Sequence, residues 1–281
     1  MVNQHTAPVE RVRFHPSQET LLCSAASDST VRLFDVRSAT QKNLGRIDVQ
    51  TRSVADVAWS TVSGSTMLAI TERNNRIHIC DTRKVSQSAP ADTKSGSANT
   101  AIVKTFSLHP SLVEACIFSP MGNHLVASTT KGGMGEVSVW EWEKEHAKTY
   151  SYPGHTGAIY TLAFSPDGQR MATGASDAIV GIWDAPTMCC TNTISRCQRF
   201  TRSVAFSHDS QYLASSQEDS IDLALASTGE LVGKIDLNGR NQRGAGGADE
   251  IAFHPKNHIL ACARCDSPVA VTVAKCSISV Q

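Results

Sequence analysis

Residues 154–184, GHTGAIYTLAFSPDGQRMATGASDAIVGIWD, contain the pattern that decides the fold. Short apolar runs alternate with turn-forming residues such as Ser165-Pro166-Asp167-Gly168. The run 179–183 is apolar on both faces, which is typical of a strand covered on both sides. We predict β-strands at 159–164, 171–175, 179–183 and, more polar, 191–194. The stretch therefore predicts a small antiparallel sheet.

The same pattern recurs along the chain. An aromatic residue that ends an apolar run is followed by Ser or His, and in four of six places then by Pro. These aromatic residues are Phe14, Trp59, Phe118, Phe164, Phe206 and Phe253, with separations of 45, 59, 46, 42 and 47 residues. A period of roughly 40–45 residues is typical of the four-stranded blades of a propeller. Six repeats are therefore recognisable.

The longest interval contains residues 84–101, a polar, Ser- and Ala-rich stretch that we expect to be a flexible insertion. The sequence predicts an all-β fold and one domain over residues 1–281. Its six blades are expected near residues 5–50, 51–84, 102–150, 155–196, 197–238 and 247–281.

The Gly-His and Trp-Asp pairs at the two ends of residues 154–184 resemble the signature of the WD-repeat β-propeller family. This resemblance implies a buried chain of hydrogen bonds through His155, Thr173, Asp177 and Trp183. Buried polar groups are unfavourable unless they are satisfied, so such a chain would specify one arrangement of strands. These residues are accordingly expected to be structural, not catalytic.

The other repeats depart from the signature by degrees. The first has His5, Ser24 and Asp28, but Phe34 stands where the tryptophan is expected. The remaining repeats keep smaller parts of it: His109, Ser128 and Trp140 in the third, Ser215 and Asp219 in the fifth, Asn74-Asn75 for the acidic residue in the second, and Asp266 in the sixth. This divergence leaves the expected fold unchanged.

Propellers of this family most often have seven blades, and a ring must close to avoid an unpaired sheet edge. Two explanations for six repeats stay open. Residues 276–280 provide the outer strand of a six-bladed ring, or a seventh, N-terminal blade is missing from this chain.

Several segments resemble one WD subfamily, the third subunits of the THO complex, which favours the missing-blade explanation. They are residues 26–37, 175–184, 202–209, 213–224 and 251–256. The resemblance implies a non-catalytic nuclear scaffold that binds other THO/TREX subunits in transcription-coupled mRNA packaging and export, with indirect or weak RNA contact. The alternative is a generic WD-repeat adaptor, such as a ubiquitin-ligase substrate receptor or a ribosome-assembly factor.

The family resemblance also implies a partner-binding rim, formed by the residue after the bulge of each innermost strand. By alignment these residues are Glu10, Ala55, Glu114, Tyr160, Arg202 and Asp249. Interface hot spots favour aromatic residues and Arg, so Tyr160, Arg202 and Phe200, with Glu218 nearby, form the candidate patch. In the alternative interpretation, Phe200 packs on its own blade and Arg202 is solvated.

Composition limits the other functions. Lys and Arg together number 26, as do Asp and Glu, which argues against a generally basic nucleic-acid binder or a membrane-surface protein. Nine cysteines without a secretory signal indicate reduced thiols. The segment 238–247 carries two Arg among glycines and is expected to be an inter-blade loop in preference to an RNA contact.

No motif indicates an enzyme, a cofactor, a small-molecule substrate or a metal site. Cys262 and Cys265 form a lone CxxC, whereas a structural zinc site needs four ligands, so core packing is favoured. Cys189-Cys190 has no acidic or histidine partner nearby in the sequence. No Gly-rich phosphate loop and no Ser/His/Asp spacing is present.

Overall fold

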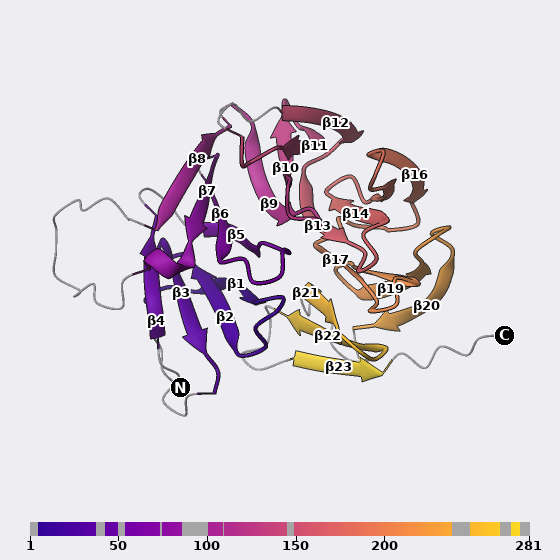
Figure 1. Ribbon diagram of the computed structural model, residues 1–281. Helices are drawn as coiled ribbons and strands as arrows, with labels where there is room; N and C mark the ends of the chain where they lie inside the picture. Colours follow the sequence, from indigo (N-terminus) through magenta and orange to yellow (C-terminus); the bar gives the residue numbers. More distant parts are fainter. Residues whose placement is uncertain are drawn as a thin grey trace. The chain divides into compact units, whose positions relative to one another are not determined.

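The computed structural model describes residues 5–37, 43–49, 54–73, 75–85, 101–108, 110–144, 149–237, 248–264 and 271–275. Within these residues almost all secondary structure is antiparallel β-sheet, with one short 3-10 helix at Thr82–Lys84. The described strands form six sheets, five of four strands and one of three (Figure 1). The predicted all-β fold class is confirmed, and the number of sheets agrees with the number of sequence repeats.

One compact unit of the chain comprises residues 1–131 and 139–150. Its first sheet is β1 (Val9–Phe14), β2 (Leu21–Ala26), β3 (Thr30–Asp35) and β4 (Asn43–Asp48), and its second is β5 (Val54–Trp59), β6 (Met67–Glu72), β7 (Arg76–Asp81) and β8 (Ile102–Ser107). The third sheet has the order β12-β11-β10-β9. Its strands β9 (Leu112–Phe118) and β10 (Leu125–Lys131) lie in this unit, whereas the residues of β11 (Met134–Trp140) and β12 (Thr149–His155) are divided between the two units.

A second unit comprises residues 132–138 and 151–281 and contains three further sheets. The fourth sheet is β13 (Ile159–Phe164), β14 (Arg170–Ala175), β15 (Val180–Asp184) and β16 (Cys189–Ile194). The fifth is β17 (Ser203–Phe206), β18 (Tyr212–Ser216), β19 (Ser220–Leu225) and β20 (Leu231–Asp236), and the last is β21 (Ala248–Phe253), β22 (Ile259–Arg264) and β23 (Val271–Lys275).

The strands predicted within residues 154–194 are all present, each within one or two residues of its predicted bounds. Their connections follow the expected turn chemistry. Gly168 adopts a positive φ of 70°, and its N–H donates to the carbonyl of Ser165 at 2.8 Å. The turn between β14 and β15 is equally tight and places Ala178 at a φ of 62°.

The hydrophobic core lies between successive sheets. Within the first unit, one face of the second sheet presents Leu68 and Ile70 to a cluster shared with the first sheet. Its opposite face presents Ala69, Ile77 and Ile79 to a cluster shared with β9 and β10. In the second unit, the fifth sheet is packed in the same way on both faces. Burial on both faces is the reason that the middle strands read as continuous apolar runs.

The second repeat extends further than its sequence predicted. We expected a blade to end at residue 84 and the next to begin at 102, but β8 pairs with β7, with Ile77 opposite Phe106. Strand β8 therefore completes the second sheet, which ends at Ser107. An insertion before the last strand of a blade has the same sequence signature as one between blades, because both are polar segments between apolar strands.

Several predicted features lie outside the described residues. They are Asn74, His109, Cys265, Asp266, most of the insertion (86–100), the Arg- and Gly-containing segment (238–247) and the expected outer strand (276–280). In the described part of the last sheet the third strand is β23, Val271–Lys275.

Candidate functional site

The fourth repeat contains a chain of buried polar side chains contributed by three strands and a turn. His155, at the end of β12, lies with Nδ1 3.0 Å from Asp177 Oδ2 and Nε2 2.7 Å from the Thr173 hydroxyl. The indole N–H of Trp183 donates to that hydroxyl at 3.0 Å. Thr173 accepts from Trp183 and donates to His155 Nε2, so every group in the chain has a partner. Such a chain is structural in character, and we call it, with its counterpart in the first repeat, the histidine clamp.

The first repeat contains a closely similar set. His5 Nδ1 lies 3.0 Å from Asp28 Oδ2, and His5 Nε2 lies 2.7 Å from Ser24 Oγ. Burial raises the pKa of Asp28, but hydrogen bonds from the Thr30 hydroxyl, the Thr6 amide and His5 outweigh it and bring the pKa to about 2. The carboxylate is therefore held in its charged form.

The corresponding polar residues of the remaining repeats have different surroundings. In the third, Ser128 Oγ accepts from the Ala115 amide at 3.0 Å, and Trp140 is buried. In the fifth, the buried Ser215 hydroxyl has no hydrogen-bond partner among the described residues. In the second, Asn75 occupies the tight turn with a φ of 69°. The histidine-centred clamp is thus a feature of the first and fourth repeats within the described part of the chain.

A β-bulge interrupts the innermost strand of most sheets. The pairing register shifts at Glu10 in β1, at Ala55 in β5, at Tyr160 in β13 and at Asp249 in β21, and also where β9 pairs with β10. A bulge turns a side chain away from the regular alternation and is frequent beside functional sites. Arg202 instead directly precedes β17. The rim residues proposed from the sequence therefore share one structural position, the start of an innermost strand.

In the second unit, three of these side chains and that of Phe200 meet across three sheets. The rings of Tyr160 and Phe200 pack edge to face with centroids 6.2 Å apart. The Arg202 guanidinium lies 5.0 Å from the centre of the Phe200 ring, and its Nη1 donates to Asp249 Oδ1 at 2.7 Å. We call Tyr160, Phe200, Arg202 and Asp249 the rim cluster. Phe200 thus packs between Tyr160 and Arg202, and Arg202 is paired although half of its side chain is exposed.

Glu218 lies in the turn after β18 and pairs with Arg199, with 2.7 Å between Oε2 and Nη1. Both side chains are exposed. The segment that carries Arg199 is anchored, because the Thr201 amide donates to the carbonyl of Ala175 at 3.0 Å. A surface ion pair of this kind contributes little stability.

The first unit carries its own charged rim. Arg73, in the turn between β6 and β7, lies 3.7 Å from a Glu10 carboxylate oxygen and 3.8 Å from one of Glu114. Glu10 also accepts from the Ser27 hydroxyl. Sequence reasoning named both glutamates but missed Arg73 and Arg199. For Arg73 the available signal was topological: the turn after each second strand lies at the same end of the sheet as the bulge of the first strand.

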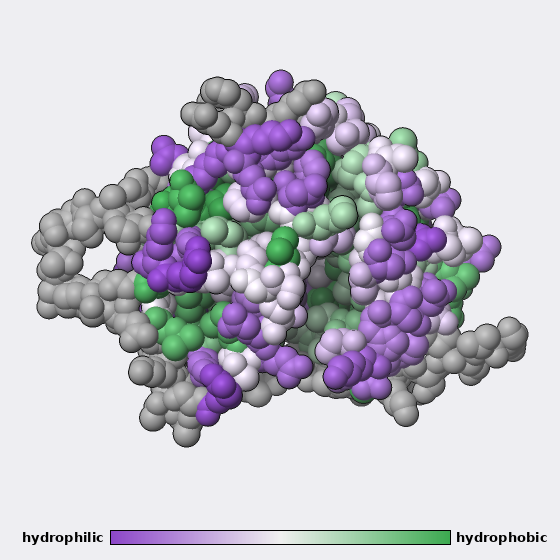
Figure 2. Space-filling model, viewed as in Figure 1, coloured by the Kyte–Doolittle hydropathy of each residue, from purple (hydrophilic) through white to green (hydrophobic). Residues whose placement is uncertain are grey.

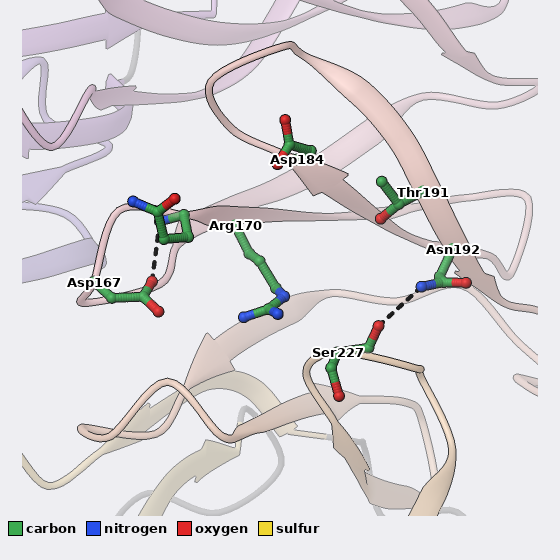
Figure 3. Close-up of a pocket in the computed structure, with 7 residues that line it drawn as sticks. Asp167, Arg170, Asp184, Thr191, Asn192 and Ser227 are labelled. Carbon is green, nitrogen blue, oxygen red and sulfur yellow. Dashed lines mark hydrogen bonds between the residues drawn. The ribbon is translucent and has the colours of Figure 1, made fainter.

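A polar hollow of about 510 Å³ lies in the second unit between β16 and the turn that follows β19 (Figure 3). Asp167, Arg170, Asp184 and Asn192 line it, and the Asn192 amide donates to the carbonyl of Ser227 at 2.9 Å. Small-molecule sites are mostly apolar with a few convergent polar groups. This lining is polar throughout, so the hollow does not resemble a substrate pocket.

The described cysteines do not form a reactive centre. Burial raises the pKa of Cys23 and of Cys80 to about 12, so both are packed as neutral thiols. Cys262 is buried on β22, as core packing requires, whereas Cys189 and Cys190 are exposed on the outer strand β16. On the face shown in Figure 2, hydrophobic areas are small and separated by hydrophilic residues. Among the described residues, no helix has the length and apolar character needed to cross a membrane.

Comparisons with known proteins agree with this architecture. The family model described as "WD domain, G-beta repeat" matches residues 1–35 and 147–184, and these two ranges contain both histidine clamps. A chain in the crystal structure of the mitotic checkpoint complex is similar in fold, with a TM-score of 0.72 and 20% identity over 94% of this chain and 74% of that one.

Among curated relatives, THO complex subunit 3 of Arabidopsis thaliana is 24% identical over 92% of this chain and 72% of its own length. WD repeat-containing protein AAC3 of Dictyostelium discoideum is 24% identical over 73% of this chain and 39% of its own. A sec13 protein of Aspergillus clavatus is 25% identical over 70% of this chain and 73% of its own. The chain thus contains WD repeats in two of its segments, and its fold is all-β and of the propeller type.

Proposed function

We propose that this chain is a non-catalytic protein-interaction scaffold whose partners bind at the starts of its innermost strands. The observation that carries the proposal is the rim cluster. Aromatic residues and Arg dominate interface hot spots because they combine large contact areas with directional hydrogen bonds. Tyr160 and Phe200 are partly exposed, and Arg202 is held by Asp249 in a fixed direction. A surface ordered in this way loses little conformational entropy when a partner binds.

The more specific part of the proposal is a role like that of THO complex subunit 3, in the nucleus, in transcription-coupled mRNA packaging and export. Likeness to that protein over 92% of this chain supports it. The partners would then be other THO/TREX subunits. RNA contact would be indirect or weak, in keeping with equal numbers of acidic and basic residues.

Affinity purification of the tagged chain from nuclear extract tests both parts. We expect THO subunits in near-equal amounts with the wild-type chain. Tyr160→Ala combined with Arg202→Ala should reduce their recovery by about tenfold or more, because it removes two hot-spot side chains. The matched control is Val232→Ala with Lys234→Ala, which alters two exposed residues of β20 in the same unit.

The outcomes separate the two parts. Unchanged recovery with the rim variant would contradict the assignment of the rim cluster as the binding surface. Recovery of a different stable assembly, with loss in the rim variant, would support the scaffold role and reject the THO assignment. That second candidate, another WD-repeat adaptor, is favoured by the match to a Caenorhabditis elegans periodic tryptophan protein 2 homolog at 32% identity over 93 residues.

A further inference from the structure

Two histidines and an aspartate from neighbouring sheets meet in the second unit, away from the rim cluster. His208 and Asp209 lie in the turn between β17 and β18, and His258 lies in the corresponding turn between β21 and β22. His258 Nε2 is 2.9 Å from Asp209 Oδ2, and His208 Nδ1 is 4.0 Å from Asp209 Oδ1. One ligand atom from each of the three lies within 4.8 Å of the others.

These histidines are departures from the repeat. The residue after the Ser or His that follows the repeated aromatic is Pro16, Pro120, Pro166 or Pro255 in four repeats, but His208 in the fifth. By the same alignment, His258 stands where the fourth and fifth repeats have Gln169 and Gln211. The fold therefore accepts other residues at both positions, and turn geometry does not require either histidine.

Comparison with Asp167 of the fourth repeat shows which carboxylate oxygen of Asp209 accepts the hydrogen bonds of the turn. Asp167 accepts from the Ser165 hydroxyl at 2.5 Å and from the Gln169 amide at 3.0 Å, both through Oδ1. Asp209 Oδ1 accepts from Ser207 at 2.5 Å and from Gln211 at 3.2 Å in the same way. Turn formation thus accounts for Oδ1. The Oδ2 atom of Asp209 faces His258 in addition, whereas at Asp167 the turn of the next repeat supplies the Ser210 hydroxyl and not a histidine.

We propose that His208, Asp209 and His258 bind a divalent transition-metal ion, of which Zn²⁺ is the best match. Two imidazole nitrogens and one carboxylate oxygen are ligands that this ion prefers. With metal–ligand distances of 2.0–2.2 Å, tetrahedral geometry separates ligand atoms by about 3.4 Å. The His258–Asp209 pair has to open by about 0.5 Å, and ligand atoms that now lie up to 4.8 Å apart have to approach by up to about 1.4 Å. A water molecule would supply the fourth ligand.

The surroundings suit such a site. The Ser207 hydroxyl and Gln211 amide hold the Asp209 carboxylate, and Tyr212 packs edge-on against His258 with ring centroids 5.5 Å apart. Supporting contacts of this kind orient metal ligands. The side chains of the three ligands are between 22% and 34% exposed, so an ion can reach them from solvent. Bound metal would tie the fifth sheet to the last sheet through two turns 49 residues apart.

The experiment is a titration of the EDTA-treated full chain with Zn²⁺ by calorimetry, repeated with Co²⁺ and followed by absorption. We expect one saturable site, and a Co²⁺ spectrum without a thiolate-to-metal charge-transfer band. His208→Pro combined with His258→Gln installs the residues found in other repeats and should weaken binding by about tenfold or more. His254→Ala is the matched control, because His254 lies in the same turn as His258 and outside the cluster.

A variant with Cys189→Ser and Cys190→Ser tests whether the exposed cysteines bind the metal instead. It should bind Zn²⁺ as tightly as the wild type does. Unchanged binding in the His208→Pro, His258→Gln variant, with its circular-dichroism spectrum preserved, would overturn the proposal. So would the absence of saturable binding by the wild-type chain, or loss of binding in the cysteine variant. The rim variant Tyr160→Ala, Arg202→Ala should retain the metal site, so this result is independent of the proposed scaffold role.

Discussion

The first and fourth repeats hold a buried histidine by the same hydrogen bonds but differ in the residues around it. In both, a histidine lies 3.0 Å from an aspartate and 2.7 Å from a hydroxyl, and the residue after the aspartate has a φ near 60° (63° at Ser29, 62° at Ala178). The fourth repeat adds the Trp183 indole N–H. The first has Phe34 instead, and the Thr30 hydroxyl donates to Asp28 at 2.6 Å.

Glycine explains why the tryptophan occurs in only one of these two repeats. A Cβ atom on Gly154 would lie 2.5 Å from the Trp183 ring, and one on Gly181 would lie 2.8 Å from its Nε1. The first repeat has Gln4 and Arg32 at the aligned positions. In the fourth repeat the position of the indole therefore requires glycine at both places, whereas the first repeat combines larger residues there with the smaller phenylalanine. The Gly-His and Trp-Asp pairs of residues 154–184 are linked by this contact.

The largest expected effect is removal of the clamp carboxylates. Asp177→Ala and Asp28→Ala should each lower the free energy of unfolding by about 3 kcal/mol, since each leaves a buried histidine and two backbone amides without their acceptor. Urea unfolding followed by tryptophan fluorescence measures this. Asp236→Ala on the exposed strand β20 is the control and should change it by under about 0.5 kcal/mol. A small effect at Asp28 alone would show that the two clamps do not contribute equally to stability.

The next effect tests the glycine requirement. Gly154→Ala should destabilise the wild-type chain by about 2 kcal/mol, because the new methyl group overlaps the indole. In a Trp183→Phe background the same substitution should be nearly neutral, which gives a coupling energy above about 1 kcal/mol in a double-mutant cycle. Gly233→Ala, which meets no atom within 4 Å, serves as the control. Equal costs in both backgrounds would disprove the link between the glycine and the indole.

A smaller effect is expected from exchanging the aromatic residues themselves. Trp183→Phe removes one buried hydrogen bond and should lower stability by about 1–2 kcal/mol. Phe34→Trp should also destabilise, by about 1 kcal/mol, because Arg32 is present where Gly181 makes room for an indole. Thermal unfolding by circular dichroism compares the two exchanges. Stabilisation by Phe34→Trp would show that the first repeat tolerates the complete clamp.

The smallest effect is the acid sensitivity of the first repeat. The pKa of Asp28 is about 2 in the folded chain, below the ordinary value of 3.8, so the unfolded chain takes up this proton first as the pH falls. The stability that the charged Asp28 carboxylate contributes is complete above about pH 4 and is lost as the pH falls from 4 towards 2. The difference in urea midpoint between wild type and Asp28→Asn should shrink over that interval. His5 and Arg32 are the charged or titratable neighbours of Asp28, and a difference that does not vary with pH would assign the effect to packing.

Local sequence patterns were sufficient for much of the fold. Alternating apolar residues and turn-forming residues act within a few positions of each other, so strands such as β13 and β14 were predicted nearly to the residue. The residues of the clamp in the fourth repeat were named from family resemblance, and the structure brings them together within 3.0 Å. The limit of the second repeat was predicted wrongly, since nothing local distinguishes β8 from the first strand of a new blade.

The sequence by itself determined the class of structure: repeated four-stranded sheets, their spacing and their apolar middle strands. Tertiary structure alone decided which side chains meet across sheets. Phe200 lies between Tyr160 and Arg202 because bulges and loop anchors redirect those side chains, and His258 reaches Asp209 because equivalent turns of adjacent sheets are neighbours in space. Period and turn chemistry are local properties, whereas the Tyr160–Phe200 and Asp209–His258 contacts join residues about 40 to 50 positions apart and depend on how one sheet packs on the next.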